Sequence, residues 1–167
     1  HCIFIVHANK LIIALVISTV LLLCSKQSQA QNFILPDGEY MDTTFTQNEK
    51  CPPQYAYFYS VGGKYPENST SLLKKVQAYL QQKNEAYTNS GYITFRFMID
   101  CEGKRIPKTR LLQTDEKYTA FHFEKKLVDE LYSFLKTLDK WVIARSTDGK
   151  AYSYKAFLTF KIKNGKV

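Results

Sequence analysis

The feature that most constrains the fold is the alternation of apolar and polar side chains in residues 92–100, YITFRFMID. Successive side chains of a β-strand point to opposite faces, so this pattern predicts a strand with one buried face. The turn sequence Asp100-Cys101-Glu102-Gly103 follows, and residues 105–113 return as a second strand. We therefore expect a β-hairpin over residues 92–113. Its buried face would carry Ile93, Phe95, Phe97 and Ile99.

Two helices and a third strand accompany this hairpin. Residues 69–83 and 119–138 both repeat apolar side chains at helical spacing, and Asn68 is expected to cap the first helix. Residues 151–163 alternate again, after the turn at Asp148-Gly149. The order helix, strand, strand, helix, strand predicts an α+β fold. We expect a small antiparallel three-stranded sheet with two helices packed on one face.

The N-terminal region has the composition of a targeting segment. Residues 11–24 form an apolar run, and Ser28-Gln29-Ala30 provides the small residues of a cleavage site. This run is shorter than the roughly 20 residues that a spanning helix needs, so we interpret residues 1–30 as a signal peptide. The alternative is an uncleaved membrane anchor. We expect residues 31–55 to be a flexible tether and residues 56–167 to form the folded domain.

Few metal-binding or redox-active side chains remain after residue 30. The cysteines and histidines among them are Cys51, Cys101 and His122. Exported proteins reach oxidising compartments, where cysteines pair, so we expect a disulfide between Cys51 and Cys101. The alternative is two separate buried thiols. These three residues are too few for a zinc site with about four ligands, and we expect no metal ion or other cofactor.

No pattern in the sequence indicates catalysis. Motifs for a nucleophilic serine, a zinc protease, a phosphate-binding loop and a dinucleotide site are all absent. His122 lies between two phenylalanines, with no serine or cysteine motif for it to activate, and we interpret it as a structural or surface residue. We therefore do not expect an enzyme. A secreted enzyme of unknown type is kept as an alternative.

Aromatic and basic residues suggest surfaces rather than active sites. Tyr55, Tyr57 and Tyr59 alternate as in an edge strand, and no arginine interleaves them as in a nucleic-acid patch. We expect no nucleic-acid partner. The formal net charge is +8, and we interpret the lysines mainly as solvated. The alternative is a basic surface for an acidic partner or an anionic membrane face.

The third strand offers a binding mechanism that needs no catalytic residue. It is long and terminal, so at a sheet edge its free N–H and C=O groups would form a template for an incoming strand. The same edge would permit self-pairing, and a strand-exchanged homodimer is a possible assembly.

A set of ordered elements runs through the chain from residue 60 onward. The Gly62-Gly63 turn precedes the first helix, and then follow residues 91–104 (GYITFRFMIDCEGK), the long helix, Trp141, Asp148-Gly149-Lys150 and Phe160-Lys161-Ile162. No single motif is diagnostic, but in this order residues 60–167 resemble the TonB C-terminal domain family. The Gly-Gly turn and the first helix are similar to the lead-in of TonB-like proteins of the Bacteroidota.

This resemblance implies a periplasmic protein-binding domain. Its last strand would pair with an extended segment of an outer-membrane TonB-dependent receptor or of another envelope protein. Because the sequence lacks a proline-rich spacer, we expect a periplasmic binding module. The alternative is an inner-membrane-anchored energy transducer that works with a complex of the ExbB/ExbD type. By this resemblance the partner-binding residues are Tyr154, Lys155, Ala156, Phe157, Leu158, Thr159, Phe160, Lys161 and Ile162.

Overall fold

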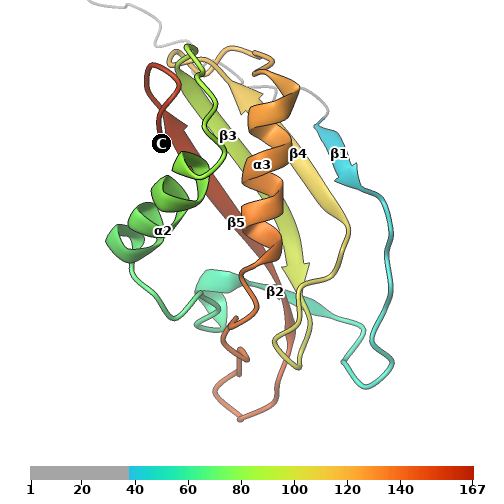
Figure 1. Cartoon of the computed structure of the whole chain (residues 1–167). Coiled ribbons are helices and arrows are strands. Elements are labelled where there is room, and N and C mark those ends of the chain that lie inside the picture. Colours follow the sequence, from blue (N-terminus) through green and yellow to red (C-terminus); the bar gives the residue numbers. More distant parts are fainter. Residues whose placement is uncertain (1–37) are drawn as a thin grey trace, which may run out of the picture. The chain divides into compact units, whose positions relative to one another are not determined.

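The computed structural model describes residues 38–167. The expected signal peptide, residues 1–30, and the first part of the expected tether lie outside the described residues. The described part is an α+β fold in which two helices, α2 and α3, lie on one face of a mixed sheet (Figure 1). We call the opposite face, which neither α2 nor α3 covers, the open face.

The sheet has five strands in the order β1-β4-β3-β5-β2. Neighbouring strands run antiparallel except β2 and β5, which run parallel. The strands are β1 (Glu39–Asp42), β2 (Tyr55–Tyr57), β3 (Gly91–Ile99), β4 (Thr109–Thr114) and β5 (Ser153–Ile162).

The expectation of a three-stranded antiparallel sheet is therefore wrong. The two additional strands, β1 and β2, are only four and three residues long. A segment that short carries no readable alternation, and it adopts a strand because a longer neighbour offers a free edge. Both strands begin within residues 31–55, the range expected to be a tether.

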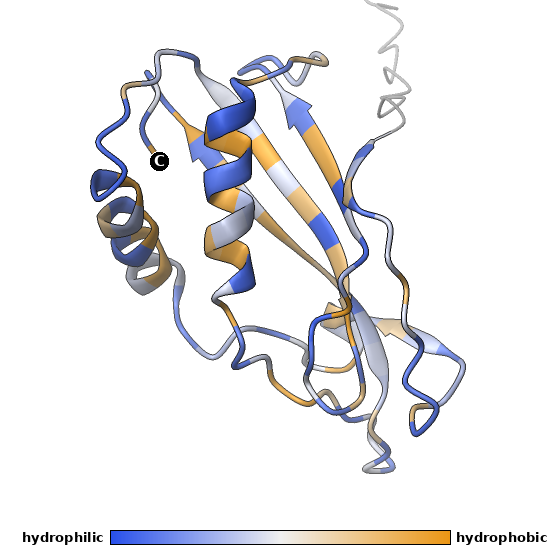
Figure 2. Cartoon of the chain, turned by 45° about the vertical axis from the view of Figure 1, so that its right-hand side comes forward, coloured by the Kyte–Doolittle hydropathy of each residue, from blue (hydrophilic) through white to orange (hydrophobic). Residues whose placement is uncertain are grey.

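The central hairpin forms as the alternation predicts. Ile93, Phe95 and Ile99 on β3 are buried against the helices, and Figure 2 shows the alternation as bands of hydrophobic and hydrophilic colour along the long central strand. The turn is closed by Asp100, whose Oδ1 accepts hydrogen bonds from the backbone N–H groups of Glu102 and Lys104, each at 2.9 Å.

Helix α2 (Ser69–Gln81) begins where the sequence predicts. The Asn68 side chain caps it by accepting a hydrogen bond from the Ser71 N–H at 2.8 Å. Val76, on the side of α2 that faces the sheet, is buried in the core. The helix therefore contributes an apolar stripe to the core.

Helix α3 (Lys125–Lys136) starts six residues later than the pattern predicts. Residues 119–123 instead run extended beside β4, because the Phe121 N–H bonds to the Gln113 carbonyl at 3.2 Å. The Phe123 N–H bonds to the Gln113 side chain at 2.9 Å. This pairing uses the donors that a helix start would leave free.

Trp141, in the chain that follows α3, is buried in the core. Its ring meets Tyr65 and Phe97 edge to face at centroid distances of 5.0 and 5.2 Å. Its Nε1–H donates to the Leu138 carbonyl at 2.8 Å. The chain that follows α3 is thereby held against β3.

Candidate functional site

The predicted partner-binding strand is β5, and its two edges differ. One edge pairs with β3 along nine residues, from Tyr154 opposite Ile99 to Ile162 opposite Gly91. On the other edge, β2 pairs only with residues 153–155. Within residues 38–167, no strand pairs with residues 156–162 on that side. We call this stretch the free edge.

The hydrogen bonds of β3 show which backbone groups point out of the free edge. The Met98 carbonyl accepts from the Ile106 N–H at 2.8 Å, so the backbone of Met98 faces the β4 side. Orientation alternates along a strand, and the backbone of Phe97 therefore faces β5. Its opposite residue, Ala156, faces β3 in turn, as Leu158 and Phe160 do. The outward backbone groups belong to the residues between them: Phe157, Thr159 and Lys161.

The side chains of these outward residues lie on the open face. Phe157, Thr159 and Lys161 are exposed, whereas Ala156 and Phe160 are buried toward the helices. The Thr159 hydroxyl pairs with the Thr94 hydroxyl of β3 at 2.9 Å. An added strand would therefore find both free backbone groups and accessible side chains along this edge.

A hollow of about 800 Å³ lies over one end of the open face. Residues 45–59 form one wall, and the ends of β3, β4 and β5 form the other. The charged side chains that line the hollow are all basic: Arg96, Lys108, Arg110 and Lys155. Most of the exposed large apolar side chains of the described chain lie in or beside this hollow: Tyr40, Phe45, Tyr55, Tyr57, Tyr59 and Phe157.

One row of side chains crosses the open face from strand to strand. The register places Tyr40 opposite Arg110, Arg110 opposite Arg96, and Arg96 opposite Phe157. The Arg110 guanidinium lies 5.7 Å from the centre of the Tyr40 ring. The row thus has two arginines at its centre and an aromatic ring at each end.

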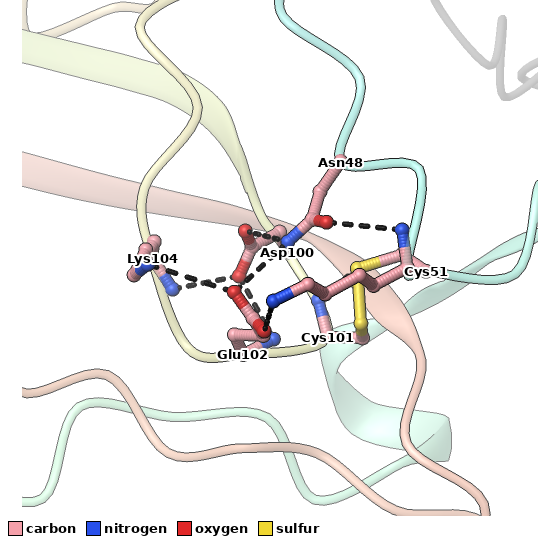
Figure 3. The surroundings of a disulfide bond; sticks show 7 residues. Asn48, Cys51, Asp100, Cys101, Glu102 and Lys104 are labelled. Carbon is pink, nitrogen blue, oxygen red and sulfur yellow. Dashed lines mark hydrogen bonds and ion pairs between the residues drawn. A yellow bond between two sulfur atoms is a disulfide. The ribbon is translucent and has the colours of Figure 1, made fainter.

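The wall of the hollow is tied to the β3–β4 turn by a disulfide between Cys51 and Cys101, as predicted (Figure 3). Their Cα atoms are 5.5 Å apart. Asn48 adds a second tie, because its amide donates to Asp100 Oδ2 at 3.0 Å and to Glu102 Oε2 at 3.1 Å.

Glu102 is an ionisable residue in the contact between residues 48–51 and the β3–β4 turn. The hydrogen bond from Asn48 lowers the pKa of the Glu102 carboxyl, and the Lys50 ammonium, 3.5 Å away, lowers that pKa further. The charged form of Glu102 therefore stabilises the contact between residues 48–51 and the turn.

His122 lies away from the hollow. Its Nε2 is 2.9 Å from Glu39 Oε1, and both side chains are largely exposed. A histidine in contact with a surface carboxylate offers an ion pair rather than a catalytic base beside a nucleophile. Within residues 38–167, no group of His, Cys, Asp and Glu side chains is arranged to hold a metal ion.

The sequence predicts the strand but not the hollow. Its alternation places Arg96 and Phe157 on strands, yet nothing in the sequence indicates that they meet Tyr40 and Arg110 on one face. A partial signal was present in the spacing, because Tyr55, Tyr57 and Tyr59 alternate just after a cysteine that could anchor them.

Comparison of the chain with models of known protein families, with curated proteins and with solved structures gives no match. None of the helices in the described part of the chain has the length and apolar character to cross a membrane. The disulfide points to an oxidising compartment, where such bonds persist.

Proposed function

We propose that this chain is a periplasmic protein-binding module that captures an extended segment of an outer-membrane protein by strand addition to β5. The observation that carries the proposal is the free edge, where Phe157, Thr159 and Lys161 point their backbone groups outward. Backbone pairing of this kind gives affinity without catalytic residues. We infer the periplasmic location and the outer-membrane partner from the resemblance of residues 60–167 to the TonB C-terminal domain.

The free edge has two features that suit it to strand addition. It belongs to the longest strand, which β3 holds in register along nine residues, so the template is already ordered before a partner arrives. The other sheet edge, β1, is four residues long and irregular between Tyr40 and Asp42. Short, irregular strands are how proteins block strand addition.

An energy transducer would use the same edge but would also need an anchor. That alternative depends on whether residues 1–30 stay attached, and these residues lie outside the described part of the chain. The intact mass of the protein from envelope fractions separates the two, because only the cleaved module would begin after Ala30.

The decisive experiment removes one outward donor from the free edge. Thr159→Pro deletes an N–H group that faces outward, whereas Leu158→Pro would break the ladder to β3. Thr159→Val is the matched control, since it loses the hydroxyl contact with Thr94 but keeps the N–H group.

A photo-crosslinking residue at Lys161 in cells would report capture. We expect cross-links to one outer-membrane protein in the wild type and in Thr159→Val, and a loss of at least tenfold in Thr159→Pro. Circular dichroism would show that both variants fold. Cross-linking that Thr159→Pro leaves unchanged would refute strand addition at β5.

A further inference from the structure

Two arginines on the open face lie directly opposite each other. Arg96 of β3 and Arg110 of β4 are directly paired, and Cα atoms in such a pair are about 5.5 Å apart. Like charges at directly opposite positions destabilise a sheet. Within residues 38–167, neither arginine belongs to an ion pair. The arrangement therefore costs stability, and an anion held between the two guanidinium groups would offset that cost.

The surroundings of the two arginines add positive charge and aromatic surface. Lys155, at the rim of the same hollow, lies 4.3 Å from the centre of the Tyr55 ring and 5.4 Å from that of Tyr57. Among the described residues 38–167, no aspartate or glutamate lines the hollow. A ligand that fits these walls carries negative charge together with apolar groups.

The hollow adjoins the free edge of β5. Arg96 lies directly opposite Phe157, the first residue of β5 whose outward backbone β2 leaves open. A strand added to β5 would run two strand spacings from β3, or about 10 Å. The side chain of a glutamate on the added strand and the side chain of Arg96 on β3 are together long enough to cover this distance. The segment that pairs with β5 can therefore place a carboxylate at Arg96, which lies beside Arg110.

We propose that the hollow binds the acidic part of an extended peptide, whose carboxylates pair with Arg96 and Arg110. Arginine suits this role because its planar guanidinium binds a carboxylate through two parallel hydrogen bonds. The inference rests on the proposed function, since it specifies the chemistry of the segment that β5 captures.

Two synthetic peptides test this inference with the full 167-residue chain. Both have ten residues and blocked ends; one alternates valine with glutamate, and the other alternates valine with glutamine. We expect the glutamate peptide to bind about tenfold or more tightly in calorimetry at low salt, because a charge-assisted hydrogen bond is worth at least that factor. The Arg96→Gln/Arg110→Gln variant should abolish this preference.

The matched control is Lys163→Gln/Lys166→Gln. It removes the same charge from two residues that also face each other, in the bridge after β5 and outside the hollow. This control should keep the preference for glutamate. An equal loss in both double variants would mean that net charge alone attracts the peptide, and the inference would fall.

The remaining outcomes separate this inference from the proposed function. If Thr159→Pro abolishes binding of both peptides and the arginine variant changes nothing, strand addition stands and the acidic specificity is wrong. If Thr159→Pro keeps a glutamate preference that requires the arginines, the hollow stands and strand addition is wrong. Inorganic phosphate that binds more tightly than the peptide would show a small-anion site and overturn the inference.

Discussion

On the helix face of the sheet, Ile93 and Phe95 have no solvent exposure, whereas Phe157 on the open face is 53% exposed. The helix face collects aliphatic and aromatic side chains from β3, β5 and both helices. The open face places two arginines between a tyrosine and a phenylalanine. Adjacent residues of the same strand, such as Phe95 and Arg96, therefore lie on a packed face and on an open face. Substitutions on the two faces should affect different measurements.

The largest effect is expected from Phe95→Ala on the helix face. Truncating a fully buried phenylalanine removes its transfer free energy and leaves a cavity, at a cost of about 3–5 kcal/mol in the free energy of unfolding. Arg96→Gln, one residue along, should change that free energy by only about 0.5 kcal/mol or less. Urea denaturation of the two variants measures both. Similar losses would mean that the open face is part of the stabilising core.

Removal of the disulfide should have a comparable but slightly smaller effect. The bond closes a loop of 50 residues, and the chain-entropy relation assigns about 4 kcal/mol to such a loop. Cys51→Ser/Cys101→Ser should lower the urea midpoint, and reduction of the wild type should reproduce the shift.

The same variant should loosen the wall of the hollow before the helix face. Hydrogen exchange should rise first at residues 48–57 and not on β3. Uniform loosening of both faces would show that the tie supports the whole fold and not only the open face.

The smallest effect is expected from Glu102→Gln. The pKa of the Glu102 carboxyl is lowered in the folded state. The charged carboxylate therefore contributes its full stabilisation at pH values above its ordinary pKa of 4.5, and this stabilisation is lost as the pH falls through the lowered pKa. The variant should be less stable than the wild type near neutral pH, and the difference should shrink in acid.

Glu116→Gln is the control for this measurement, since in the described structure the Glu116 carboxylate forms no ion pair with a neighbour. Urea titrations at neutral and acidic pH compare the three proteins. If the difference for Glu102→Gln does not depend on pH, the Asn48 contact does not act through the carboxylate charge.

The parts of the fold that the sequence predicted are those with a strong local pattern. The alternation around Phe95 and the apolar stripe of α2 each identify a buried face without knowledge of the partner element. The pattern predicts too early a start for α3 because Phe123 fits the apolar stripe of the helix. In the structure Gln113 instead accepts hydrogen bonds from the backbone N–H groups of Phe121 and Phe123, which run extended beside β4.

The open face could not be predicted because it depends on register. Arg96 meets Arg110 only in the observed pairing; a slip of one residue would place Leu111 opposite it and invert the faces of β4. Tyr40 reaches the row through β1, a strand too short to show a pattern of its own. Contacts between segments far apart in the sequence leave no trace in a single sequence.

The parallel pairing of β2 with the start of β5 has a consequence for the size of any captured segment. Tyr57 already occupies the position beside Lys155, so an added strand cannot extend beyond Phe157 in that direction. The opposite end of β5 is Ile162. Six residues at about 3.4 Å each allow a footprint of roughly 20 Å. Because β2 is paired beside Lys155, the free edge could pair with only about six residues of an added strand.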